Sequence, residues 1–314
     1  MSGVYTKKHV EDVFDRSEGA LPFKLQRIAE EELGETSAKR QDALAKLAQL
    51  LSGLEQLRRI AGSCAGRQFL LRFLRVRKYD VEAALRTIRN YYKIRNTSGP
   101  VFQDFLPHKV ISATRKLMMV MPDTDVHGRP IFLYKPGSWI LDETSYVEMH
   151  RALMLCLEHL AKDPATQTLG MVILFDYAGF TPEKLLAFNI GLIRRGVEYL
   201  QDCMPMRLEA VHTVRQGVAF DMFFTLIKPF LKTKLIQRFR LYGEKFEALH
   251  KEVPPQILPE EYGGQAPPPD FDGFWSELER REDEYRENSS YGYVRRRDEN
   301  FATDAEIENE ATFL

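Results

Sequence analysis

Cysteine and histidine are the residue types through which this chain of 314 residues would most readily hold a metal ion. Cys156 and His159 stand at the i, i+3 spacing that puts two side chains on one face of a helix, and His150 lies two to three turns before His159. A metal site needs further ligands, and no additional Cys, Asp or Glu set follows at ligand spacing. A buried cysteine beside a surface histidine is the better interpretation, so the sequence predicts no metal site.

The residues that could act as nucleophiles or acid–base groups lack the partners that such chemistry needs. Cys203 and Arg207 are four residues apart without a phosphate-cradling loop, and Ser138 lacks the strand-to-helix context of a nucleophile elbow. Nothing in the sequence places the carboxylates of Glu158 and Asp176 together. Neither glycine-rich phosphate loops nor nucleic-acid-binding motifs occur. We therefore expect no catalytic residues, no cofactor and no nucleic-acid partner.

Residues 218–240 join an aromatic apolar run to a run of cations. A helix would place five apolar side chains on one face, at i, i+3, i+4, i+7 and i+11: Phe220, Phe223, Phe224, Ile227 and Leu231. Met222, Leu226 and Phe230 would widen that face. Such a helix must be covered by protein, by a ligand or by a membrane, and composition alone favours an ordinary core helix. The second half contains five cations and no acid: Lys228, Lys232, Lys234, Arg238 and Arg240.

The order of predicted elements indicates an α/β fold. Helices are expected at 21–33, from Thr36 or Ser37 to Leu54, and as two helices within 68–95 joined at 78–80. Short apolar runs then predict strands at 116–121, 130–135, 169–176, 208–214 and 239–242, with helices at 144–161 and 182–203 between them. Such alternation is typical of a largely parallel sheet. One polar helix is expected at 274–286, and the remainder is expected to be disordered.

The apolar pattern and its breaks after Gly99–Pro100 and at 254–265 divide the chain into a flexible N-terminus (1–20), an N-terminal helical domain (21–100), an α/β domain (101–265) and an acidic C-terminal extension (266–314). From Asp270 onward 14 acidic and 6 basic residues give a net charge of −8, so the preceding residues carry +7 of the total of −1. The N-terminus has no apolar signal core, and Asp221, Lys228 and Pro229 interrupt the longest apolar stretch. Three widely separated cysteines suit a reducing compartment. We expect a cytoplasmic protein without a transmembrane helix.

Six motifs together resemble the CRAL-TRIO family of lipid-transfer proteins, in its branch of tocopherol and retinaldehyde carriers, over about residues 21–265. They lie at 69–84, 90–95, 174–180, 202–207, 227–235 and 257–264. The resemblance implies a helical domain followed by an α/β domain whose mostly parallel sheet floors an apolar cavity. It makes 218–240 the lid helix over that cavity, and it places Leu153, Leu157 and Phe175 among the cavity residues.

The same branch has a basic cleft for phosphoinositide headgroups, and its positions fall on Arg77, Arg207, Lys234 and Arg238, with Arg207 where a lysine is usual. The alternative is that the long cationic side chains only surround an apolar face. The segment 212–217 reads HTVRQG where the family has HLINEP, and 176–180 reads DYAGF where the family has DLEGW. These departures leave the ligand open between a tocopherol-like molecule, a retinoid, a carotenoid and a sterol.

The sequence thus favours an intracellular carrier of a hydrophobic lipid that exchanges its ligand at phosphoinositide-containing membranes when the lid opens. On this hypothesis Phe223→Asp lowers transfer and leaves ligand binding nearly intact. The alternative is a non-enzymatic membrane adaptor. Its C-terminal residues Thr312, Phe313 and Leu314 place a hydroxyl two before an apolar terminal residue, as a PDZ partner requires.

Overall fold

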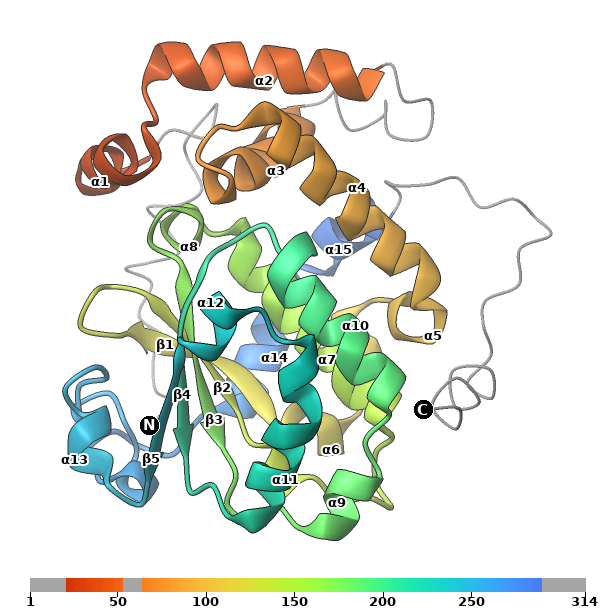
Figure 1. Cartoon of the computed structure of the whole chain (residues 1–314), viewed down its shortest axis with the longest axis vertical. Coiled ribbons are helices and arrows are strands. Elements are labelled where there is room, and N and C mark those ends of the chain that lie inside the picture. The colour runs from red at the N-terminus through yellow and green to blue at the C-terminus, as the bar shows by residue number, and fades with distance from the viewer. Residues whose placement is uncertain (1–20, 53–63, 290–314) are drawn as a thin grey trace.

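The computed structural model describes residues 21–52 and 64–289 (Figure 1). The expected flexible segment 1–20 and the C-terminal motif at 312–314 lie outside these residues. The first four helices are α1 (Phe23–Leu33), α2 (Ser37–Ser52), α3 (Cys64–Val76) and α4 (Val81–Thr97). Asp80 caps α4 by accepting a hydrogen bond from the amide of Ala83, which satisfies one of the free N–H groups in the first turn.

A five-stranded sheet forms the centre of the α/β part. Its strands are β1 (Met118–Thr124), β2 (Pro130–Tyr134), β3 (Met171–Asp176), β4 (Leu208–Val214) and β5 (Phe239–Gly243). They lie in sequence order, with β1 antiparallel to β2 and the other neighbours parallel. This arrangement confirms the expected α/β class with a mostly parallel sheet. Right-handed crossovers between successive parallel strands put the connecting helices on one face of the sheet.

Those connecting helices are α7 (Tyr146–Lys162), α9 (Pro182–Leu186), α10 (Ile190–Glu198) and α11 (Val218–Ile227). The single helix expected at 182–203 is wrong. Asn189 accepts a hydrogen bond from the amide of Leu192 and so starts α10 as a separate helix, and residues Tyr199–Cys203 form a π-turn. Short helices complete this part: α5 (Gly99–Phe102), α6 (Ser112–Arg115), α8 (Pro164–Leu169), α12 (Thr233–Ile236) and α13 (Phe246–Leu249).

The expected lid helix ends earlier than its apolar pattern. It stops at Ile227, and a 3-10 turn (Lys228–Phe230) leads to α12, so Leu231 is not on the same helix as Phe220. Pro229 explains the stop, because proline lacks an N–H and its ring clashes with the preceding turn of a helix.

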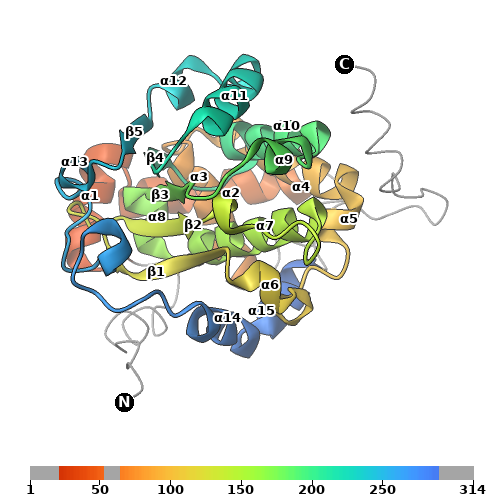
Figure 2. The same cartoon turned by 90° about the horizontal axis from the view of Figure 1, so that it is seen from below.

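The polar helix expected at 274–286 is instead a pair, α14 (Phe271–Arg280) and α15 (Glu282–Ser289), which Figure 2 shows beside β1 and α6. Phe274, Trp275 and Leu278 are buried. The indole N–H of Trp275 donates to the carbonyl oxygens of Arg115 and Met118 at 3.0 and 3.2 Å. One face of α14 is therefore part of the core. No described helix is long and apolar enough to cross a membrane.

Candidate functional site

Aromatic side chains fill the space between the sheet and α11. The register of β2 and β3 sets Tyr134 beside Phe175, with ring centroids 5.4 Å apart. Phe175 and Tyr177 share a face of the sheet, and their rings are 5.8 Å apart. Tyr177 in turn contacts Phe220 at 4.7 Å and Phe223 at 6.5 Å, both on α11.

Phe188, between α9 and α10, extends this contact network away from the sheet. Its ring lies 5.4 Å from Phe223, 5.5 Å from Phe180 and 4.9 Å from Tyr146 at the start of α7. We call the seven residues that line this space and α11's inner face the aromatic layer: Tyr134, Phe175, Tyr177, Phe180, Phe188, Phe220 and Phe223. The layer joins the sheet, α9 and α11 through side chains without charge.

All the residues expected in the lid and cavity except Phe220 belong to the main hydrophobic core or pack against it, and Phe220 contacts Tyr177 of the aromatic layer. Phe220, Ile227 and Leu231 are buried, whereas Phe223 and Phe224 are half-buried. Phe224 contacts Phe239 of β5 with rings 5.0 Å apart. On α7, Leu157 is fully buried, and Leu153 is half-buried against the same core.

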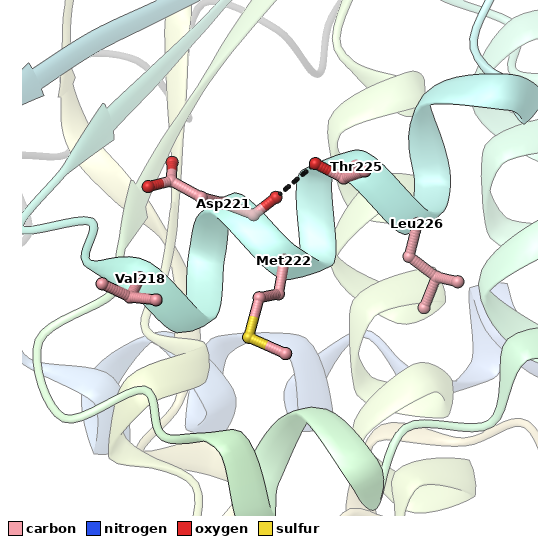
Figure 3. A pocket seen from close by; sticks show the side chains of 5 residues that line it. All are labelled: Val218, Asp221, Met222, Thr225 and Leu226. Carbon is pink, nitrogen blue, oxygen red and sulfur yellow. Dashed lines mark hydrogen bonds between the residues drawn. The ribbon is translucent and has the colours of Figure 1, made fainter.

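The outer side of α11 is also apolar, which the sequence analysis did not separate from the inner side. Val218, Met222 and Leu226 are 77%, 52% and 43% exposed at i, i+4 and i+8 spacing, and we call them the outer face. They line a shallow hollow of ≈ 490 Å³ with Asp221 and Thr225. Figure 3 shows Met222 and Leu226 pointing to one side of α11 and Asp221 and Thr225 to the other. The i, i+4, i+8 spacing of these three residues could have predicted the second apolar stripe from the sequence.

Two of the four expected phosphoinositide-binding residues share one carboxylate. Arg207 and Arg238 directly precede β4 and β5, which are neighbouring parallel strands. The guanidinium groups of both approach Glu209, at 3.6 and 3.7 Å. Arg207 also donates to Glu32 of α1 at 2.9 Å and to the carbonyl oxygen of Thr168. The cations at this edge of the sheet are therefore already paired with acids of the same chain.

The other two cations lie on neighbouring elements. Arg77 follows α3 and donates to the hydroxyl of Thr87 at 2.7 Å. Burial raises the pKa of the Cys203 thiol to about 12, and the positive charges of Arg77 and Lys232 lower that pKa by smaller amounts. Lys234 is exposed on α12. The structure thus joins Arg207 to Arg238 through Glu209, whereas Arg77 follows α3 and Lys234 lies on α12.

An ion network precedes the N-terminal end of α11, and we call it the anchor. Arg215 has a left-handed backbone conformation, with φ of 53°. Its guanidinium contacts both carboxylate oxygens of Asp176, with Nε at 2.9 Å from Oδ1, and one oxygen of Glu261 at 3.1 Å. The hydroxyl of Tyr262 donates to Asp176 at 3.0 Å. The buried carboxylate at the end of β3 therefore fixes the chain two residues before Gly217, the N-cap of α11.

The C-terminal end of α11 is held by the π-turn that precedes β4, through contacts that we call the latch. The side-chain amide of Gln201 donates to the carbonyl oxygen of Phe230 at 3.1 Å and accepts from the amide of Lys232 at 2.6 Å. The ammonium of Lys232 pairs with Asp202. Sequence reasoning missed both the anchor and the latch.

The candidate catalytic groups are engaged in structural contacts. Burial raises the pKa of the Cys156 thiol well above its usual value, as it does for Cys203, so both thiols are protonated at neutral pH. Glu158 accepts hydrogen bonds from two tyrosine hydroxyls at 2.6 and 3.2 Å, and Asp176 belongs to the anchor. In the described ranges no group of three or more His, Cys, Asp or Glu side chains could hold a metal ion.

The chain is similar to known proteins over about two thirds of its length. Residues 114–264 match the CRAL/TRIO domain family. The alpha-tocopherol transfer protein-like protein of Homo sapiens is 39% identical over 199 residues, which cover 63% of this chain and 58% of that protein. Clavesin-2 of Rattus norvegicus is 32% identical over 229 residues, covering 71% of this chain and 68% of that protein.

Among solved structures, Sfh5 superposes with a TM-score of 0.52 and covers 76% of this chain and 92% of its own, at 13% identity. This likeness concerns the fold alone. The chain spans less than two thirds of the length of the human relative, and more than two thirds of Clavesin-2. On the family match and these identities, the chain belongs to the CRAL-TRIO family.

Proposed function

We propose that the protein is a cytoplasmic carrier that holds one largely apolar lipid beneath α11 and exchanges it at phosphoinositide-containing membranes. The aromatic layer carries this proposal, because it offers an uncharged surface of rings between a rigid sheet and a single covering helix. The name of the human relative, alpha-tocopherol transfer protein-like, supports a lipid ligand. A tocopherol-like molecule, a retinoid or another isoprenoid suits such a surface, and no bond is broken.

Release into water would be slow for such a ligand. Burying roughly 400 to 500 Å² of apolar surface at about 25 cal/mol/Å² contributes on the order of 10 kcal/mol. A membrane removes this barrier, since it offers the ligand a second apolar medium. It also offers one to the outer face of α11, whose Met222 is 52% exposed in the closed arrangement.

Phosphoinositide recognition would supply the signal for opening. Lys234 lies on α12, which follows the 3-10 turn after α11, and Arg238 follows α12 and shares Glu209 with Arg207. Arg77 is the fourth cation of the proposed cleft and follows α3. A cation close to an anionic surface contributes about 1 kcal/mol. Multiply charged headgroups would compete with Glu32 and Glu209 for the guanidinium of Arg207, and this exchange would place the membrane next to the latch.

Mass spectrometry of the organic extract of the purified full chain tests the carrier function. We expect one lipid per protein molecule, lost to acceptor vesicles faster when these contain phosphatidylinositol bisphosphate. Arg77→Glu and Lys234→Glu are expected to remove that dependence on the phosphoinositide. Protein purified without any stoichiometric lipid, yet bound to the same vesicles, would instead support the adaptor function.

A further inference from the structure

A block of acids lies beyond Ser289, the last residue that the structure describes. Residues 298–310 contain no base and six acids: Asp298, Glu299, Asp304, Glu306, Glu308 and Glu310. Blocks of five or six like charges are often interaction segments, because their charges repel one another and favour a surface of opposite sign. The partner of this block should therefore be cationic.

Cations outnumber acids on the surface that follows α11. We call five of them the cationic surface: Arg207, Lys228, Lys232, Lys234 and Arg238. Three acids pair with members of this surface: Glu32, Asp202 and Glu209. Lys228 and Lys234 are exposed and pair with no acid in the described part of the chain. With five cations and three acids, the surface keeps a charge of +2.

This surface already binds a carboxylate from a distant segment. Glu32 of α1 accepts a hydrogen bond from Arg207 at 2.9 Å, although the two residues are 175 positions apart in the chain. The side chain of Glu32 is 52% exposed, and an exposed pair of this kind is weak. Another carboxylate can therefore take its place.

The described chain ends close to the cationic surface. Helix α15 is attached to the end of α7 by Glu284, which accepts from the ammonium of Lys162 at 2.9 Å. Helix α8 follows α7, and the carbonyl oxygen of Thr168 near its end accepts from Arg207. With six residues α8 is about 9 Å long, whereas residues 290–298 span up to about 30 Å when extended. The acidic block therefore begins within reach of Arg207.

We propose that residues 298–310 bind the cationic surface of their own chain and compete there with phosphoinositide headgroups. The inference rests on the proposed function and adds a regulator of the same site. A phosphate monoester carries up to about two charges and a carboxylate one, so a phosphoinositide displaces the segment more readily than phosphatidylserine does. The segment thereby makes membrane binding selective for the more highly charged headgroup.

The test compares the full chain with a variant in which amides replace the six acids, D298N/E299Q/D304N/E306Q/E308Q/E310Q. We expect this amide variant to bind phosphatidylinositol bisphosphate vesicles about tenfold more tightly, because two or three exposed ion pairs, each worth up to about fivefold, no longer compete. The matched control removes six exposed carboxylates from the described part of the chain, D104N/D123N/D142N/E143Q/E260Q/D272N. It should change the affinity by less than about threefold.

The acetylation rates of single lysines, measured by mass spectrometry, locate the segment. Lys234 should react several-fold more slowly in the wild type than in the amide variant, at a rate that does not depend on protein concentration. Lys93 is the internal control, since it is exposed with Arg86 and Arg89 on another cationic stripe, the outer side of α4. Its rate should be the same in both proteins.

The outcomes separate this inference from the proposed function. An equal gain of affinity in both variants, or an unchanged rate at Lys234, overturns the inference and leaves the phosphoinositide site standing. Protection of Lys93 in place of Lys234 puts the segment on α4, and a rate that depends on protein concentration assigns the contact to a second copy; either result also overturns it. If Lys234 reacts faster in the amide variant but neither protein prefers phosphoinositide vesicles over phosphatidylserine vesicles, the contact stands and phosphoinositide recognition falls.

Discussion

The two ends of α11 are held by ion pairs that differ in burial. Before its N-terminus, Arg215 pairs with Asp176, whose side chain is 1% exposed. After its C-terminus, Lys232 pairs with Asp202, and these side chains are 59% and 37% exposed. Breaking a buried ion pair costs about 3 to 5 kcal/mol, whereas an exposed pair contributes about 0 to 1 kcal/mol. The comparison predicts that α11 opens from its C-terminal end and turns about its N-terminal end.

The anchor and the latch lie at opposite edges of the sheet. The anchor lies at the carboxyl ends of β3 and β4, beside the aromatic layer, and the latch lies at the opposite edge of the sheet with the cations. A headgroup bound by those cations would act on the weak end of the lid. On the proposed function, the ligand site would then open at the side that faces the membrane.

Removing the anchor should have the largest effect. Arg215→Met leaves the buried carboxylate of Asp176 with the ammonium of Lys135, at 3.9 Å, as its remaining cation. We expect the free energy of unfolding to fall by about 3 kcal/mol or more in urea denaturation. Arg240→Met, which removes an exposed arginine on β5, is the control and should change stability by less than about 0.5 kcal/mol. Equal losses in both variants would contradict the anchor.

A charge on the outer face should have the next largest effect. Met222→Asp is expected to weaken binding to anionic vesicles by about 10- to 100-fold, because it removes a side chain worth about 1.5 to 3 kcal/mol in an apolar medium. Ligand affinity should stay near that of the wild type. Val126→Asp replaces an apolar side chain that is 49% exposed in the turn between β1 and β2 with the same charge, and should have a much smaller effect in the same sedimentation assay.

The matching change one residue further along has a different expected result. Phe223 contacts Tyr177, Phe180 and Phe188, so Phe223→Asp would introduce a charge into the aromatic layer. We now expect it to weaken ligand binding as well as transfer, contrary to the expectation from sequence. The physical reason is that the apolar pattern of 218–231 contains two stripes, and only the structure assigns each to a side.

Structural features that neighbouring residues encode could be predicted from the sequence, whereas contacts between residues far apart in the sequence could not. Strand β4 begins and ends where its apolar run does, because a buried strand is encoded by consecutive residues. The early end of α11 was also local, since Pro229 was available as a stop signal. The latch joins Gln201 to a segment about thirty residues later, and Glu209 joins two arginines through parallel register. No local pattern specifies such pairs, so they required the fold.

Releasing the latch should have a moderate effect confined to one end of α11. Gln201→Ala removes two hydrogen bonds to the backbone at 230 and 232, a loss of about 1 to 2 kcal/mol. Amide hydrogen exchange across 228–236 should therefore be roughly tenfold faster, and lipid transfer a few-fold faster. Gln216→Ala, which removes a glutamine contact to Gly243 near the anchor, should leave exchange across 228–236 unchanged. If amide exchange became faster at both ends of α11 in either variant, the two ends would not be held by independent contacts.

The smallest expected effect concerns the acid that pairs with the cations near the latch. Glu32 is 52% exposed and bonds Arg207 at 2.9 Å, so a phosphate group must displace it to reach the same guanidinium. An exposed pair of this kind contributes at most about 1 kcal/mol, and Glu32→Gln should raise affinity for phosphatidylinositol bisphosphate vesicles by up to about fivefold. Glu31→Gln makes the same charge change one residue away, where the carboxylate pairs with Arg27. If both variants raise the affinity equally, the gain comes from net charge; a gain in Glu32→Gln alone identifies competition at Arg207.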